Sequence, residues 1–460
     1  MRKQENNKTF KYMNSNFFTW PLALHRAAAL LGFLLLTTTV MAQQPQQYLS
    51  AQESEPHNFG WMQGFPPPPA KVLKVSDGSF FEFPAIRWSV VHMRELLPTV
   101  DVSGGLDAPV SLAYDLDKSI DSLKFLPWEA QDSMTWEASL WKNYTDGIII
   151  LHRGKVVYER YFSELTESDV HAVMSLTKSF TGTLAATLVA EGVLDENKLV
   201  SEYVPELKNS AFGDATVRQV MDMTTALDYS EDYANPDAEV WDFSAAGSPL
   251  PKPKDYDGPR GYYQYLETVK KNGQHGEAFG YKTVNADALG WIMAKATGKP
   301  VNELLSDKIW SKLGVEQDSY YQVDGLGTPF AGGGFNAGLR DLARFGEMIR
   351  QKGQWQGQQV IPAEAVADIE KGGSPEKFAK SDHPGLKGWS YRDMWWMTEN
   401  EHGAFSARGV HGQAIYIDPK AEMVIVRLAS HPVAANAAND AYSLPAYQAV
   451  AEYLMRKDGR

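Results

Sequence analysis

The chain has 460 residues, of which 43% are hydrophobic and 12% aromatic, so it can bury a large core and is not generally disordered. Its formal net charge of −13 argues against nucleic acid and anionic membranes as partners. The absence of cysteine excludes disulfides, thiol chemistry and cysteine metal sites.

The first predicted element is a secretory signal peptide over residues 1–42. This segment has a basic start and then an apolar run, AAALLGFLLLTTTVMA, that ends on the small residue Ala42. These features are typical of a cleaved signal. The run is shorter than the roughly 20 residues of a membrane helix, although an uncleaved N-terminal anchor is the alternative. We expect a periplasmic or secreted protein with no membrane partner after cleavage.

Residues 43–85 are rich in glutamine, proline and glycine, with four consecutive prolines at 66–69. This composition predicts an extended lead-in. The next segment, residues 87–98, carries several apolar side chains and predicts a short helix docked on the rest of the protein.

Two hairpins are predicted, one near each end of the remaining chain. Residues 146–162 contain two β-rich runs around Arg153-Gly154-Lys155. Residues 411–430 contain two more around Asp418-Pro419-Lys420. Strand-like runs separated by such turns indicate antiparallel pairs.

Helical periods dominate between residues 175 and about 350. The order of elements therefore predicts an α+β fold, an α/β/α sandwich in which an antiparallel sheet from both chain ends is flanked by helices. A mostly helical subdomain is inserted at about 190–345, within a catalytic domain over 86–455. Clefts favour the junction of such parts, so we expect the active site between sheet and helical region.

Ser175 and Lys178 form a Ser-x-x-Lys pair where a helix is predicted to begin. Phe180, Leu184 and Leu188 then recur at the spacing of a buried helix face. A desolvated lysine one turn from a serine can accept its proton, and a helix N-terminus favours a developing oxyanion. The alternative is an ordinary N-cap serine beside a solvated lysine.

A second Ser-x-x-Lys, from Ser374 to Lys377, shows that the pair alone is a weak signal. About one or two copies are expected by chance in a chain of this length. This copy lies in a polar run that no amphipathic helix follows, so we interpret it as a loop.

Further polar positions could complete a hydrolase site. Tyr281 and Asn285 stand at the start of another predicted helix, and a glycine-flanked strand entry at 411–413 could offer a backbone N–H to an oxyanion. Taken singly, each position has an ordinary interpretation: Tyr233 as a surface aromatic, Asn285 as a helix cap and His411 as a turn residue.

Together these segments resemble the serine β-lactamase and penicillin-binding protein superfamily, in its class C β-lactamase and esterase branch, over roughly residues 85–450. The segments that carry the resemblance include VMSLTKS, TVRQVMDMTTALDY and GGGFNAGLRDLARFGEMI. Within the superfamily the chain most resembles the 6-aminohexanoate-dimer hydrolases, through RWSVVHMRELLPT, DYSEDY and HGQ.

The resemblance implies Ser175 as the nucleophile, Lys178 as its proton acceptor and Tyr281 as the residue that carries the proton to the leaving group. Backbone N–H groups of Ser175 and of residues 411–413 would form the oxyanion hole. The implied substrate-binding set consists of Tyr233, Asn285, His411, Gly412 and Gln413.

The chain departs from the branch at two points. The branch has Tyr-x-Asn, whereas the spacing here is Tyr281-x-x-x-Asn285, which leaves the role of Asn285 open. The branch has Lys-Thr-Gly before the last hairpin, and residues 410–413, Val-His-Gly-Gln, stand in its place. Without that lysine, the carboxylate of a β-lactam loses a charged partner.

We therefore expect a carboxylesterase or amidase that cleaves small esters or linear amides through an acyl-enzyme. The alternatives are a β-lactamase or D-Ala-D-Ala carboxypeptidase, and a non-catalytic binding protein of the same fold. No cofactor is implied, and the ten histidines lack zinc-hydrolase spacings such as H-E-x-x-H. The sequence does not indicate the oligomeric state.

Overall fold

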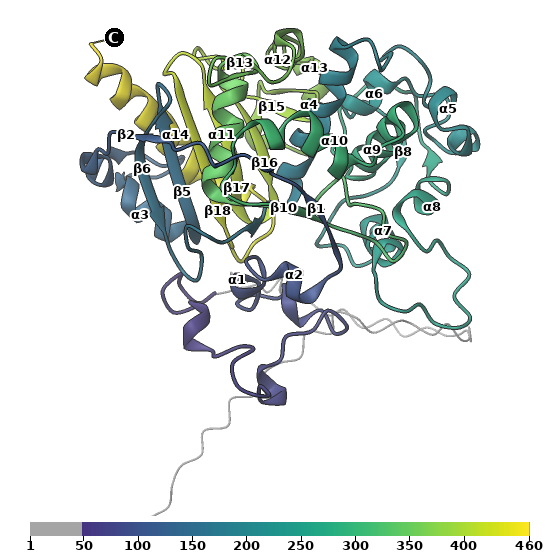
Figure 1. Ribbon diagram of the computed structural model, residues 1–460, viewed down its shortest axis with the longest axis horizontal. Helices are drawn as coiled ribbons and strands as arrows, with labels where there is room; N and C mark the ends of the chain where they lie inside the picture. The colour runs from purple at the N-terminus through teal and green to yellow at the C-terminus, as the bar shows by residue number, and fades with distance from the viewer. Residues whose placement is uncertain (1–47, 460) are drawn as a thin grey trace, which may run out of the picture.

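The structure, a computed structural model, describes residues 48–459, so the predicted signal peptide lies outside the described part. At its centre is an eight-stranded sheet (Figure 1). In spatial order its strands are β14 (Ser390–Arg392), β15 (Trp395–Met397), β16 (Phe405–Gly409), β17 (Gln413–Asp418), β18 (Met423–Ala429), β5 (Thr145–His152), β6 (Lys155–Tyr161) and β2 (Ala113–Tyr114). Neighbouring strands are antiparallel except β2 and β6, which are parallel.

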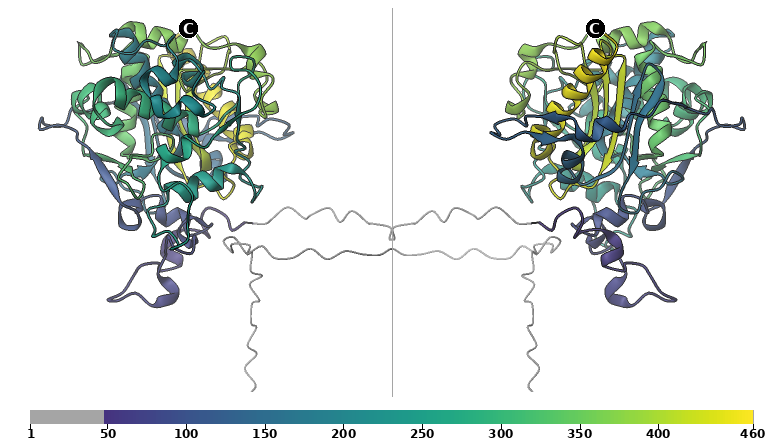
Figure 2. Two further views of the ribbon diagram at one scale, coloured as in Figure 1. Left: turned by 90° about the vertical axis from the view of Figure 1, so that its right-hand side faces the viewer. Right: turned by 90° about the vertical axis from the view of Figure 1, so that its left-hand side faces the viewer.

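Side chains alternate between the two faces of this sheet, and both faces are buried. In β5, Ile148 and Ile150 belong to the same apolar cluster as α3 (Trp136–Lys142) and α14 (Ala437–Lys457), whereas Ile149 and Leu151 belong to the main core on the other face. Figure 2 (right) shows α3 and α14 together on one face. The opposite face is covered by α11 (Leu339–Arg350), and α4 (Thr177–Ala190) packs beyond it in the same core.

The predicted sandwich and its two hairpins are confirmed. β5 and β6 pair around Arg153 and Gly154, whose positive φ values of 51° and 77° form the tight turn. β17 and β18 pair at the other end of the chain, and β18 lies directly beside β5. Antiparallel pairing of β18 with β5 is what joins the two ends of the chain in one sheet.

The region between these two ends contains short strands as well as the helices that its sequence predicted. Its helices are α5 (Val200–Tyr203), α6 (Val217–Met221), α7 (Glu239–Gly247), α8 (Tyr262–Leu266), α9 (Val284–Thr297) and α10 (Val301–Lys308), and later come α12 (Ala363–Glu370) and α13 (Pro375–Phe378). A second, antiparallel sheet runs through the same region, in the order β1 (Thr99–Val102), β10 (Ser319–Gln322), β11 (Phe335–Ala337) and β7 (His171–Ala172). Three small hairpins add β3 (Lys124–Phe125) to β4 (Met134–Thr135), β8 (Leu227–Asp228) to β9 (Lys270–Lys271), and β12 (Gln354–Trp355) to β13 (Gln358–Gln359).

The predicted helix over 87–98 is instead two short helices, α1 (Ile86–Ser89) and α2 (Met93–Leu96). Before them, residues 48–85 form three short 3₁₀ turns joined by loops. Arg87 connects this lead-in to the central sheet. Its guanidinium donates to Ser54 Oγ at 2.8 Å and forms an ion pair with Asp146 of β5 at 3.3 Å. The described residues contain no helix long and apolar enough to cross a membrane.

Helix α4 packs tightly against the sheet at Gly182. A Cβ added there would lie 1.9 Å from the carbonyl oxygen of Asp393, in the turn between β14 and β15. We expect Gly182→Ala to lower the free energy of unfolding by about 2–4 kcal/mol, because the backbone must move to admit the methyl group. Urea denaturation would measure the loss. The matched control is Gly385→Ala, where a Cβ meets nothing within 4 Å; equal stability of the two variants would contradict the prediction.

Candidate active site

Ser175 lies in a 3₁₀ turn, Met174–Leu176, that leads directly into α4. Met174 has a φ of 50°, a left-handed conformation that is costly for a residue with a Cβ. The turn is held in place by Thr177, whose Oγ1 donates to the Met174 carbonyl at 2.6 Å and accepts from the Phe335 N–H at 3.1 Å. The serine is thus presented by a strained turn with rigid supports on both sides.

Lys178 is almost fully buried, and its side-chain nitrogen points at the serine. Nζ lies 2.9 Å from Ser175 Oγ and donates to the Gly332 carbonyl at 2.7 Å. One helical turn separates the serine from the lysine, so their approach is local, but Gly332 comes from a loop more than 150 residues later. The Gly332 carbonyl therefore fixes the position of Lys178 Nζ beside the Ser175 hydroxyl.

Tyr281 completes the cluster from the loop before α9. Lys178 Nζ lies 5.0 Å from the centroid of its ring. The ring also packs against Trp396, at 5.3 Å between centroids, and against Tyr391 and His383 at 6.3 Å each. Burial raises the pKa of Tyr281 above its usual value; the Lys178 charge opposes this rise and the Glu231 carboxylate adds to it. The hydroxyl therefore keeps its proton at neutral pH and can donate it.

Glu231 is a residue of this site that the sequence analysis did not single out. Its carboxylate accepts from the Thr283 N–H and from Thr283 Oγ1, both at 2.5 Å. It also accepts from the hydroxyl of Tyr233 at 2.7 Å. Thr283 stands two residues after Tyr281, where the resembled branch has its asparagine, so Glu231 fixes the loop that carries Tyr281.

We expect Glu231→Gln to lower kcat about tenfold and to move the alkaline limb of the pH–rate profile to lower pH. The carboxylate raises the pKa of Tyr281, so its loss lets the tyrosine deprotonate earlier, and a deprotonated tyrosine cannot protonate a leaving group. Glu239→Gln is the matched control, because Glu239 bonds the N–H of Ser230 in the same loop but not Thr283. An unmoved alkaline limb would contradict this role.

Tyr233 is part of the same network through its hydrogen bond to Glu231, and it remains 38% exposed. Its ring meets Trp241 edge to face at 6.0 Å. The exposed tyrosine thus borders the Glu231–Tyr281 region, where a substrate could contact it.

Asn285 and Gln413 are tied within the protein. Asn285 Oδ1 accepts from Thr225 at 2.6 Å, and its Nδ2 donates to the Lys282 carbonyl at 3.1 Å. The Gln413 amide exchanges two hydrogen bonds with the backbone of Ala429, at 2.5 and 3.0 Å. Both side chains therefore brace the structure, and their predicted contact with substrate stays a prediction.

The strand entry after β16 also differs in detail from the expectation. The His411 N–H donates to the Ala434 carbonyl at 2.9 Å, and its ring nitrogen Nδ1 lies 2.7 Å from the His431 carbonyl. Burial lowers the pKa of His411 to about 4, so the ring is neutral at pH 7. His411 and Gly412 both have positive φ, 63° and 99°. Residues 411–412 therefore form a tight, uncharged turn.

The part of this segment that packs against the turn with the nucleophile is Gly409. A Cβ there would lie 2.5 Å from the Val173 carbonyl and 3.0 Å from the Leu176 N–H. The end of β16 thus packs backbone to backbone against the turn that holds Ser175, and any larger residue would separate them. The sequence signal was the short Arg-Gly-Val-His-Gly run, in which the first glycine rather than the second makes the contact.

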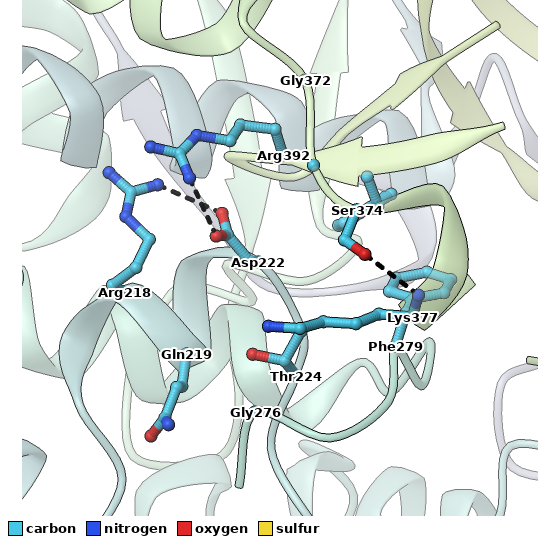
Figure 3. Close-up of a pocket in the computed structure, with 12 residues that line it drawn as sticks. Arg218, Gln219, Asp222, Thr224, Gly276, Phe279, Gly372, Ser374, Lys377 and Arg392 are labelled. Carbon is cyan, nitrogen blue, oxygen red and sulfur yellow. Dashed lines mark hydrogen bonds and ion pairs between the residues drawn. The ribbon is translucent and has the colours of Figure 1, made fainter. Parts of the chain in front are cut away.

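The second Ser-x-x-Lys lies elsewhere, beside a cavity of about 280 Å³ (Figure 3). Ser374 caps the short helix α13 by accepting from the Lys377 backbone N–H at 3.2 Å. The Lys377 side chain extends away from the serine hydroxyl in Figure 3. We interpreted this copy as a loop; it is a capped helical turn, and it shows what the ordinary form of the motif looks like.

The described residues, 48–459, contain no group of three or more histidine, cysteine, aspartate or glutamate side chains arranged to hold a metal ion. The chemistry of the cluster around Ser175 is instead that of a nucleophile with two proton-transfer groups.

Comparison with known proteins identifies this arrangement. The model of the Beta-lactamase family matches residues 138–448, which is more than half of the chain. The chain belongs to the β-lactamase family. The predicted resemblance is confirmed, and the matched region includes both hairpins of the sheet, the turn with Ser175 and the loop with Tyr281.

Relatives within the family are similar over most of their length. A 6-aminohexanoate-dimer hydrolase from Paenarthrobacter ureafaciens is 34% identical over 392 residues, 85% of this chain and 92% of that protein. A solved structure from Bacillus anthracis, whose assignment as a 6-aminohexanoate-dimer hydrolase is provisional, is 33% identical with a TM-score of 0.75 and covers 84% of this chain and 99% of its own. These similarities identify the chain as a serine hydrolase of the amidase or esterase type.

The fold extends further than the sequence similarity. EstCE1, a hydrolase with promiscuous acyltransferase activity, is only 15% identical, yet it aligns with a TM-score of 0.53 over 68% of this chain and 96% of its own. At this identity the likeness shows the fold alone.

Proposed function

We propose that the protein hydrolyses small linear amides and esters through an acyl-enzyme on Ser175. The observation that carries this proposal is the 2.9 Å contact between Lys178 Nζ and Ser175 Oγ, with the centroid of the Tyr281 ring 5.0 Å from the same nitrogen. A nucleophile, a group that takes its proton and a protonated tyrosine in one cluster are the parts that acyl transfer needs.

In the first step, Ser175 Oγ attacks the substrate carbonyl and its proton passes to Lys178, which acts here as the neutral amine. The Tyr281 hydroxyl protonates the leaving nitrogen or oxygen and is reprotonated through Lys178, the bond to the leaving group breaks, and an ester on Ser175 remains. Water then attacks this ester, with the same groups taking and returning the proton, and the acid is released. The helix N-terminus beside Ser175 would favour the negative charge that develops on the carbonyl oxygen.

The uncharged turn at 411–412 supports linear substrates over β-lactams. The position that a lysine occupies in the β-lactamase branch holds a neutral, buried histidine. On the other side of the site, Glu231 places a negative charge near Tyr281. A β-lactam carboxylate would find no cation at His411 and would be repelled by Glu231. An amide or ester without that carboxylate would not be repelled.

The test is to compare three substrates with the purified protein: a p-nitrophenyl ester, a chromogenic cephalosporin and a linear 6-aminohexanoate dimer. We expect turnover of the ester and the dimer with little or no cleavage of the cephalosporin. Turnover of the cephalosporin alone would replace the proposal with a β-lactamase. No turnover of any of the three, together with no labelling of Ser175 by a fluorophosphonate, would leave a non-catalytic binding protein.

We also propose that the enzyme is exported, on the strength of the basic and apolar segment that ends at Ala42. Mass spectrometry of the protein from cell fractions would test this. An N-terminus near residue 43 in the periplasm or medium would support export, and an intact N-terminus in the cytosol would contradict it.

A further inference from the structure

A second polar site lies on the opposite side of the central sheet from α4, between the strands and α14. It is a small, partly open cavity of about 10 Å³, enough for a single small occupant. Its walls come from β16, β17, β18 and α14. It does not include Ser175, Lys178 or Tyr281, so it is separate from the proposed active site.

The charges around this cavity do not balance. The charged groups that line it are Arg408, Arg427 and Asp440. Arg408 forms an ion pair with Asp440. Arg427 is buried, with 3% of its surface exposed, and it forms no ion pair with any carboxylate among residues 48–459. Its guanidinium donates only to neutral acceptors, the Gly412 carbonyl and Asn439 Oδ1, each at 2.9 Å.

Several polar groups of the residues that line the cavity also lack a hydrogen-bond partner within the described chain. Arg408 Nη1, Asn439 Nδ2 and the Tyr447 hydroxyl are buried and have no hydrogen-bond partner within the described chain. All three can donate. The side-chain oxygen of Asn436 is also unpartnered and can only accept, but rotation of that amide presents its NH₂ group instead. Buried donors without partners are rare in folded proteins.

We propose that this cavity binds a monatomic anion, a chloride or a similar halide, between Arg427 and Arg408. A single negative charge balances the buried Arg427, which would otherwise be costly at so buried a position. The three unpartnered donors supply its coordination. Water matches the size of the cavity but leaves the positive charge uncompensated, and a metal cation would add to it.

The anion would act on the proposed active site only at a distance. Arg427 holds the carbonyl of Gly412, and Gly412 belongs to the turn that follows Gly409, the residue packed against the turn with the nucleophile. Halide binding therefore stabilises the strand end behind the site, and it does not depend on which substrate Ser175 accepts.

The test is thermal unfolding of the full protein, moved into sodium gluconate and titrated with sodium chloride or bromide at constant ionic strength. We expect a saturable rise in Tm, on the order of 2–4 °C, with either halide. Crystals grown in bromide should show an anomalous peak in the cavity. A Tm that is the same in gluconate, chloride and bromide would overturn the proposal and leave a buried water.

Two variants separate binding from general salt effects. Asn439→Asp places a carboxylate where Arg427 Nη2 already finds an oxygen, so its Tm should no longer respond to halide. Asn209→Asp, which adds the same charge at an exposed position, should keep the response. If Asn439→Asp does not fold, Tyr447→Phe removes one donor and should raise the halide concentration at half-maximal shift severalfold. A wild-type response in Asn439→Asp or in Tyr447→Phe would contradict the site.

Discussion

Replacing Ser175 with alanine is expected to reduce ester and amide hydrolysis by about 10⁴-fold or more, to near the uncatalysed rate. The substitution removes only the oxygen that lies 2.9 Å from Lys178, while Lys178 keeps its bond to the Gly332 carbonyl. The turn is held by Thr177 rather than by the serine hydroxyl, so the fold should survive. Steady-state rates on a p-nitrophenyl ester, with circular dichroism to confirm the fold, would measure the effect.

The matched control is Ser374→Ala, which changes the serine of the other Ser-x-x-Lys. Ser374 caps a helix, so the variant should lose about 1 kcal/mol of stability and none of the activity. Comparable activity losses in the two variants, or full activity in Ser175→Ala, would sink the assignment of the nucleophile.

Replacing Lys178 with methionine is expected to lower kcat by about 10³-fold or more while substrate binding changes little. Methionine has a similar length and suits the buried position, so the loss should come from missing proton transfer more than from unfolding. The change does leave the Gly332 carbonyl without its donor, which should lower stability by about 1–3 kcal/mol. Burst and steady-state kinetics would separate slower acylation from slower release of the acyl group.

Lys377→Met is the control for this prediction, since that lysine has the same sequence spacing but points away from its serine. The double variant Ser175→Ala with Lys178→Met should be no less active than Ser175→Ala alone, because groups that act as one unit lose their joint effect once. Lys178→Met with more than a tenth of the wild-type rate would contradict the role of the lysine.

Much of the architecture could be predicted because it is encoded locally. The β-rich runs around Arg153-Gly154 and around Pro419 contain their own turns, so each hairpin forms from neighbouring residues. The single helix over residues 87–98 was predicted wrongly because local spacing was not enough there. Its apolar spacing suits a helix, but the chain bends at Val90–His92, where the Ala172 N–H donates to the Val90 carbonyl. The hydrogen-bond partner at this bend lies 82 residues later in the chain, beyond the reach of a local pattern.

The candidate site likewise has a part encoded by local sequence and a part set by contacts between distant segments. Ser175 and Lys178 could be found because three residues of helix bring them together wherever the helix packs. Asn285 stood out by its type and position, yet its amide is used by Thr225 and Lys282. Glu231, by contrast, carried no pattern of its own, and its importance comes from contacts with Thr283, 52 residues later.

By itself, then, the sequence determined the two hairpins of the central sheet, the helical character of the middle of the chain, the Ser-x-x-Lys pair and the family resemblance, since these depend on short spacings. Only the tertiary structure decided which carbonyl holds Lys178, which carboxylate fixes the Tyr281 loop and which glycine packs against the turn with the nucleophile. It alone also left Arg427 buried without a counter-charge. The physical reason is that each of these facts is an approach between distant segments, set by how the sheet and helices pack, and packing depends on the whole chain at once.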